Sequence, residues 1–289
     1  MREVSSRPGP DSGRRRSRLF TSPLLAASAV THGAGAAALV ASPESAPLIA
    51  SILVANHAVI ATAGMFPRSG WLGPNLTRLP TNDATDTAIA LTFDDGPDPA
   101  VTPQVLDLLD EAGQKATFFC IGQRALQHPD LIANMRARGH GVENHTFHHR
   151  NSFALGGPRR MTSEVTRAQD AIEASGGGLP TFFRAPAGIQ NPWLHDVLAD
   201  AGLRMVSWTR RGFDAVTHDA SRVAARLIGH GLSAGDILLL HDGASLSARA
   251  EPRTVVLDAL PRVLEEMARR GLRSESLHVA MGTSTKTLT

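Results

Sequence analysis

The sequence contains a single cysteine, no tyrosine and almost no net charge, and each scarcity excludes something. One cysteine, Cys120, cannot form an intrachain disulfide, so no disulfide framework holds this chain. Because Cys120 lies in the apolar run ATFFCIG, we interpret it as a packed strand thiol and not as a nucleophile. The 29 basic and 27 acidic side chains leave a net charge of +2, which is too little for a nucleic-acid surface.

The 289 residues otherwise have the composition of a globular protein. Apolar residues make up 42% and charged residues 19%, which is typical of a folded domain with a sizeable core. The length suits one large α/β domain with an appendage better than two full domains. Arginines gather in residues 1–18, and we predict that this basic leader is disordered.

A long stretch nearly without charge follows the leader. Between Leu19 and Pro67 the only charged residue is Glu44, which lies between two apolar runs. Each run exceeds about 20 residues, enough to cross a hydrocarbon layer of about 30 Å as a helix. We predict that residues 19–67 form a helical membrane hairpin, with both ends in the cytoplasm by the positive-inside rule. A signal peptide in the first run, or two helices packed on the domain, are the alternatives.

Beyond the hairpin, the chain changes character twice. Residues 68–86 are rich in proline, glycine, asparagine and threonine and are interpreted as a connector. In residues 87–277, short apolar runs alternate with longer helical patterns in six or seven βα units, which indicates a parallel sheet or an incomplete barrel. In such folds the chemistry gathers where strands end. Residues 278–289 are interpreted as a tail.

Two adjacent carboxylates, Asp94 and Asp95, end an apolar run and precede the turn-forming pair Gly96-Pro97. At a strand end followed by a turn, both carboxylates can reach one pocket, although they would face opposite sides within a regular strand. Two such charges repel each other unless a cation or a base lies with them. An Asx-turn with solvated acids is the alternative.

Three histidines follow another short apolar run: His145, His148 and His149. His145 and His149 are four residues apart, which would place both imidazoles on one face of a helical turn and leave His148 off that face. Exposed histidine clusters are common, but together with the aspartates this spacing predicts one carboxylate and two imidazoles around a divalent ion. Such a site leaves positions open for water and substrate, as metal-assisted hydrolysis requires.

Later apolar runs also end in polar residues. Arg184 follows TFF and is suited to hold a catalytic carboxylate ionised, or else to form a structural salt bridge. Trp208 and Asp214 come from the next run. His241 ends the most hydrophobic run, DILLL, and has an aspartate available to orient it. This arrangement favours a general acid, with a capping histidine as the alternative.

These blocks in this order, with TFDDGP, HTFHH, RAPAG and LLHD among them, resemble the polysaccharide deacetylase family. The family is also called the nodulation-protein-B homology domain or carbohydrate esterase family 4. The resemblance covers about residues 87–277 and implies an α/β fold, a distorted (β/α) barrel of about seven units, preceded here by the apolar hairpin. It also implies that Asp95, His145 and His149 bind a divalent metal, usually Zn²⁺.

The same resemblance implies roles for the remaining polar residues. Asp94 would be the catalytic base and His241 the catalytic acid. Arg184 would orient Asp94, and Asp214 would tune His241. Water would attack the N-acetyl carbonyl, and the backbone N–H of Ala187 would help to stabilise the resulting oxyanion.

The implied activity is metal-dependent hydrolysis of an N-acetyl (N-acyl) group on an amino sugar. The substrate would be a cell-envelope glycan, an oligosaccharide or a lipid-linked sugar, and the hairpin would place the protein at the inner membrane of a bacterial cell envelope. The side of the domain is left open, because polymer substrates lie outside the cytoplasm whereas two spans return the chain inside. A catalytically silent glycan-binding barrel and an amidohydrolase of a non-sugar amide are the alternatives.

Three neighbours of the site depart from the family's usual residues. Arg150 stands where proline is common, Ala187 where an aromatic is common, and Ala215 where tryptophan is usual. Aromatic residues are only 4% of the chain. A short or lipid-linked sugar is therefore expected before a long polysaccharide stacked on aromatic rings.

Overall fold

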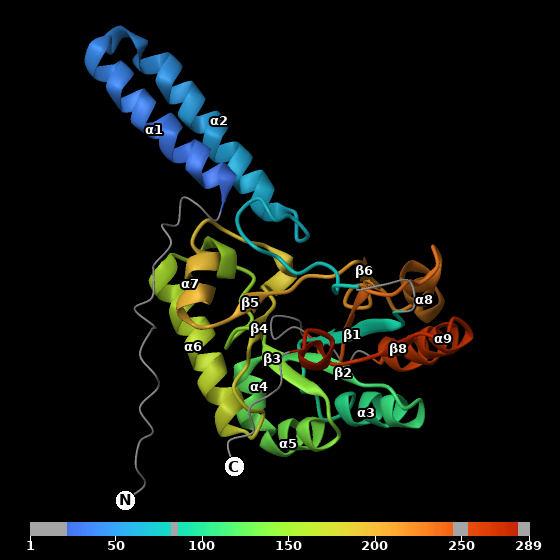
Figure 1. Cartoon of the computed structure of the whole chain (residues 1–289). Coiled ribbons are helices and arrows are strands. Elements are labelled where there is room, and N and C mark those ends of the chain that lie inside the picture. The colour runs from blue at the N-terminus through green and yellow to red at the C-terminus, as the bar shows by residue number, and fades with distance from the viewer. Residues whose placement is uncertain (1–21, 82–85, 245–253, 283–289) are drawn as a thin grey trace, which may run out of the picture.

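The structure is a computed structural model that describes residues 22–81, 86–244 and 254–282. The predicted disordered leader, residues 1–18, and the last seven residues of the predicted tail lie outside the described residues. Figure 1 shows a hairpin of two long helices that projects from a domain in which helices surround a curled set of strands.

The hairpin consists of two helices and a short turn: α1 (Pro23–Ala41), η2 (Pro43–Ser45) and α2 (Ala46–Met65). The helices lie side by side (Figure 1), and Asn56 Nδ2 donates to Ser28 Oγ at 2.8 Å between them. Many of their large apolar side chains are exposed, among them Val30, Leu48, Ile52 and Val54. By length and composition alone, both are apolar enough to cross a membrane, a property that they share with signal sequences.

Seven parallel strands form the curled sheet in the order β5-β4-β3-β2-β1-β7-β6, and β8 pairs with β1. Their bounds are β1 (Ala88–Asp94), β2 (Ala116–Cys120), β3 (Gly141–Asn144), β4 (Phe182–Phe183), β5 (Arg204–Met205), β6 (Arg210–Arg211), β7 (Ile237–His241) and β8 (Arg273–Ser274). β5 and β6 are consecutive in sequence but lie at opposite ends of this order. The sheet is thus an open, distorted (β/α) barrel, as predicted.

Helices that alternate with the strands cover the outside of the sheet (Figure 1). They are α3 (Thr102–Glu111), α4 (Gly122–Gln127), α5 (Pro129–Ala137), α6 (Pro158–Ala174), α7 (Leu194–Asp200), α8 (Ala220–Ile228), α9 (Val255–Arg269) and α10 (Leu277–Ala280), with short turns η3 (Phe153–Leu155) and η4 (Pro186–Gly188). α9 buries Val256, Leu260, Val263 and Met267, at the spacing of one helical face, against the strands. This packing of helices on strands holds the strands, and therefore their ends, in place. Cys120 is buried in β2, as predicted.

Both segments that flank the predicted catalytic region contact the barrel. In the connector, Leu76 bridges to Val206 beside β5, and the N–H of Leu79 donates to the carbonyl of Gly235 just before β7. The connector therefore joins the edge strand β5 to the region just before β7, which neighbours the other edge strand, β6. At the other end, the buried imidazole of His278 in α10 pairs with Glu143. The first residues after position 277 therefore pack into the fold.

Candidate active site

The strand ends bring the predicted polar residues together. Asp94, the last residue of β1, pairs in register with His241, the last residue of β7. His145 and Arg184 directly follow β3 and β4 in the same sheet. Because all these strands run parallel, their carboxyl ends share one edge, and the four side chains meet there.

Asp94 and Asp95 reach the same pocket by different routes. Asp94 extends from the strand, whereas Asp95 adopts a left-handed backbone conformation with φ of 75°, which turns its carboxylate toward the same space. Arg124 holds this turn, since its Nη1 donates to the carbonyl of Asp95 at 2.6 Å. Asp242 packs so closely on Gly96 that a Cβ there would overlap its carboxylate. Nothing in the sequence had distinguished Arg124 from other arginines on helices.

Asp95, His145 and His149 form a cluster with the dimensions of a metal site. Their ligand atoms all lie within 4.8 Å of one another. Asp95 Oδ1 is 3.2 Å from His149 Nε2 and 3.5 Å from His145 Nε2. Two ligand atoms about 2.0–2.1 Å from one ion lie about 3.3–3.4 Å apart in a tetrahedral arrangement, so both separations from Asp95 suit ligands that share one divalent ion. Within the described residues, the buried Asp95 Oδ1 has no hydrogen-bond partner, which suits an atom that binds a cation.

Hydrogen bonding determines which nitrogen of His145 is available to bind a metal ion. Its Nδ1 is 2.8 Å from the carbonyl oxygen of Arg184. Because a carbonyl only accepts, Nδ1 carries the hydrogen, and Nε2 in the neutral ring keeps its lone pair toward Asp95. Metal-bound histidines show this same arrangement.

The charges in the cluster also suit a cation. Burial alone would raise the pKa of Asp95, but the surrounding imidazoles outweigh that effect and lower it, so the carboxylate is ionised. Burial lowers the pKa of His149 to about 4, so this ring is neutral at neutral pH. For His145, burial would lower the pKa, but the attraction of Asp94 raises it. A proton and a metal ion would therefore compete for His145 Nε2.

The histidines meet for a different reason from the one that their spacing suggested. Residues 145–149 form a loop and not a helical turn, and Thr146 (φ 65°) and His149 (φ 49°) are left-handed. The prediction of a shared helical face was therefore wrong, although the rings of His145 and His149 do meet, with centroids 4.7 Å apart. His148 lies outside the cluster, as expected. Its Nδ1 is 2.7 Å from the carboxylate of Glu164.

Arg184 is fully buried and holds Asp94 in place. Its Nη1 donates to Asp94 Oδ1 at 2.7 Å and to Thr92 Oγ1 at 2.8 Å, while Nη2 donates to the carbonyl of Ser207 at 3.0 Å. The guanidinium also lies over the ring of Phe119, 4.1 Å from its centroid. Asp94 Oδ2 stays on the side of the metal cluster, 3.8 Å from His145 Nε2.

His241 and Asp214 form a second buried pair at this edge. Asp214 accepts from the Nδ1 of His241 at 2.9 Å and from its backbone N–H at 2.7 Å. Burial would lower the pKa of His241, but the carboxylate of Asp214 outweighs it and raises the pKa to about 9. His241 is therefore protonated at neutral pH, and its Nε2 is the atom placed to donate a proton outward.

Ala187 lies in η4, three residues after Arg184, and is therefore at the same edge of the sheet. Its backbone is left-handed, with φ of 55° and ψ of 6°. The side chain is exposed, while Pro186 and Gly188 on either side are buried. The role of its N–H toward an oxyanion stays a prediction.

Known proteins are similar to this chain in sequence and in fold. Residues 81–206 match the family described as Polysaccharide deacetylase. The chain is 38% identical over 219 residues to a chitooligosaccharide deacetylase of Sinorhizobium fredii, covering 70% of this chain and 95% of that protein. It is 33% identical over 187 residues to a peptidoglycan-N-acetylglucosamine deacetylase of Bacillus cereus, covering 64% and 84%. A solved structure, a family 4 carbohydrate esterase from Streptomyces lividans in complex with acetate, matches with a TM-score of 0.58 at 34% identity, covering 65% and 91%.

Proposed function

The chain belongs to the polysaccharide deacetylase family and is a hydrolase of carbon–nitrogen bonds other than peptide bonds, and we propose that it removes the N-acetyl group from an amino sugar of the bacterial cell envelope. One observation supports this most strongly. A three-ligand cluster, a carboxylate fixed by a buried arginine and a histidine held by an aspartate share one edge of the barrel. The named activities of the two relatives favour N-acetylglucosamine as the sugar.

We propose Zn²⁺ as the ion that Asp95, His145 and His149 hold. One carboxylate and two imidazoles are ligands that zinc prefers, and Asp95 lies close enough to both imidazoles to share one ion with them. When bound, the ion would polarise the acyl carbonyl and lower the pKa of a water molecule.

Asp94 is the base of the proposed reaction. Arg184 fixes its Oδ1, so Oδ2 is the oxygen that can take a proton on the side of the cluster. As water attacks the acyl carbon, one of its protons passes to Asp94 and the carbonyl electrons move onto oxygen. The backbone N–H of Ala187 would donate to that oxyanion, because it lies at the same edge on the loop after Arg184.

His241 is the acid. Asp214 fixes its ring, and the raised pKa keeps it protonated at neutral pH. When the carbon–nitrogen bond breaks, Nε2 of His241 gives its proton to the leaving nitrogen, so a free amine and acetate result. The acid product loses its remaining water-derived proton to solvent to become acetate, and transfer of the proton from Asp94 to His241, directly or through solvent, returns both residues to their starting states. No covalent enzyme intermediate is required.

We also propose that the hairpin, residues 19–67, anchors the protein in the inner membrane. α1 and α2 are long enough to span a bilayer, and many of their large apolar side chains are exposed. The hydrogen bond between Asn56 and Ser28 pairs polar groups that would otherwise face lipid.

Acetate release tests this function. The full chain, purified in detergent and loaded with Zn²⁺, is incubated with N-acetylglucosamine oligomers, peptidoglycan fragments or a lipid-linked N-acetylglucosamine. We expect acetate from at least one substrate, with one new primary amine for each acetate. Absence of acetate with all three, from protein shown to contain zinc, would refute the proposal.

A further inference from the structure

The base of the hairpin is joined to the loops that carry the candidate site. The carbonyl of Pro67 accepts from Ser207 Oγ at 2.5 Å, and Arg68 Nη1 donates to the carbonyl of Thr209 at 3.0 Å. Gly188 packs so closely that a Cβ there would lie 2.5 Å from Pro67 Cβ. Gly188 and Ser207 follow β4 and β5. The hairpin therefore meets the domain at the same edge of the sheet as the site.

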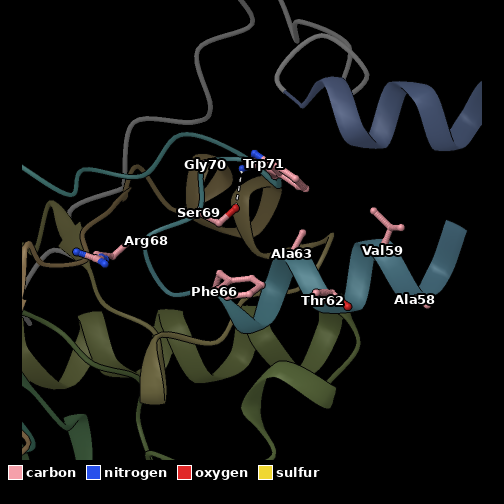
Figure 2. Close-up of a pocket in the computed structure, with 9 residues that line it drawn as sticks. All are labelled: Ala58, Val59, Thr62, Ala63, Phe66, Arg68, Ser69, Gly70 and Trp71. Carbon is pink, nitrogen blue, oxygen red and sulfur yellow. Dashed lines mark hydrogen bonds between the residues drawn. The ribbon is translucent and has the colours of Figure 1, made fainter. Parts of the chain in front are cut away.

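An apolar groove of about 650 Å³ opens at this junction. Figure 2 shows it between the last turns of α2 and the chain that turns back after Met65. Its walls are mainly hydrocarbon, contributed by Ala58, Val59, Ala63, Phe66 and Trp71. Such a volume is typical of sites for small apolar ligands.

The groove lies on a helix that exposes many of its large apolar side chains. Phe66 is 62% and Trp71 63% exposed, although both are large apolar side chains. Along α2, Leu48, Ile52 and Val54 are exposed as well. Large apolar side chains exposed in this number mark a place where another apolar phase or molecule binds.

The level of the groove matches a membrane boundary. Aromatic residues directly follow the apolar helix, and the first charged residue after Glu44 is Arg68. Aromatic belts and arginines occupy this level in membrane proteins. Ser22 Oγ, at the start of α1, donates to the carbonyl of Trp71 at 2.6 Å, so both ends of the hairpin lie at this same level.

We infer that this groove binds one hydrocarbon chain of a bilayer lipid, an inference that rests on the proposed membrane anchoring of the hairpin. The lipid's hydrocarbon chain would lie beside α2, with its headgroup end at the level of Phe66 and Trp71. Since Pro67 is fixed to Gly188 and Ser207, a lipid bound here holds the catalytic edge of the barrel at the membrane surface. An amino sugar carried on a lipid would then meet the site without leaving the bilayer.

Quenching by brominated lipid tests the groove. The full chain is reconstituted in phosphatidylglycerol vesicles whose acyl chains are brominated or unmodified. The emission of Trp71 is obtained by subtracting that of Trp71→Phe. Two alanines of α2 provide a matched pair, because Ala58 lines the groove and the exposed Ala55 does not. Thr62→Phe, at another lining position, repeats the test in case Ala58→Phe fails to fold.

We expect Trp71 to lose most of its emission in brominated vesicles. Ala58→Phe and Thr62→Phe should abolish most of that loss by filling the groove, while Ala55→Phe should leave it unchanged. Quenching that persists in both filled variants, or that Ala55→Phe reduces equally, would overturn the groove and leave membrane anchoring intact. No quenching in the unmodified chain would show that no lipid chain reaches Trp71, and would overturn the groove whether or not the hairpin spans the bilayer.

Discussion

Asp214 holds His241 through both carboxylate oxygens, one on the imidazole Nδ1 and the other on the backbone N–H of the same residue. The backbone N–H of His241 fixes the carboxylate of Asp214, and this carboxylate in turn holds the imidazole ring. The orientation and the charge of the His241 ring therefore both depend on the Asp214 side chain. Both residues are buried, which strengthens this dependence because water does not screen the pair.

Replacing Asp214 by asparagine should lower the pKa of His241. The pKa of His241 is about 9, above the ordinary 6.5, because Asp214 outweighs burial. A group with a raised pKa keeps its proton until the pH rises through that value. Loss of the proton from His241 therefore lowers the activity at alkaline pH and leaves the acidic side of the pH profile unchanged. In Asp214→Asn, the alkaline fall of kcat should therefore begin at lower pH. Rates of acetate release from about pH 6 to about pH 10 measure this shift.

The exposed Asp219 is the control for this variant, since Asp219→Asn also removes one aspartate charge but lies outside the site. Its pH profile should match that of the unmodified protein. An alkaline limb at the same pH in Asp214→Asn would contradict the role assigned to this pair.

Replacing His149 should remove metal binding, whereas replacing its neighbour His148 should not. His149 Nε2 faces Asp95, but His148 is paired with Glu164 away from the cluster. We expect His149→Ala to weaken zinc affinity by about 100-fold or more, and His148→Ala to leave it nearly unchanged. Competition with a coloured zinc chelator measures both constants. Equal zinc affinities in the two variants would exclude the three-residue site.

Comparison of Gly188, which packs on the base of the hairpin, with Gly202, which does not, distinguishes the effect of packing from that of backbone strain. Gly188 has φ of 72° and Gly202 has φ of 70°, so alanine is strained at both positions. A Cβ at Gly188 would also lie 2.5 Å from Pro67 and 2.7 Å from Trp208, whereas a Cβ at Gly202 meets nothing within 4 Å. Overpacking of this kind costs about 1–3 kcal/mol.

Gly188→Ala should therefore lower the free energy of unfolding by about 1–3 kcal/mol more than Gly202→Ala does. Urea unfolding curves of the two variants give the difference. If both variants lose the same stability, Pro67 and Trp208 do not pack as closely on Gly188 as the structure shows.

The sequence was sufficient to predict which residues meet in the barrel. Apolar strands that end in Asp94 and His241 must place both at one edge of a parallel sheet, because that geometry follows from the alternation of strands and helices. The spacing of His145 and His149 misled, because four-residue spacing implies a shared face only in a helix. The left-handed turn there depends on local hydrogen bonds, including the backbone N–H of His149 to Thr146 Oγ1 at 3.0 Å, that no periodic pattern encodes.

Contacts between distant segments were beyond the reach of the sequence. Arg68 binds a carbonyl 141 positions away, and Arg124 supports Asp95 from a helix. The connector carries two apolar residues, Leu76 and Leu79, among turn-forming ones, so its composition predicted a linker. Its packing between β5 and the region just before β7 follows from where these strands lie, which is a property of the whole fold.

Acetate release by Asp94→Asn, with bound zinc measured in the same sample, tests the proposed chemistry most directly. Asparagine keeps the size of Asp94 and cannot take up the proton of water, and Asp94 is not one of the three clustered ligands. We expect release from N-acetylglucosamine oligomers to fall by about 10²–10⁴-fold while the zinc content stays equal to that of the unmodified protein. Undiminished release by zinc-loaded Asp94→Asn would contradict the assignment of Asp94 as the base.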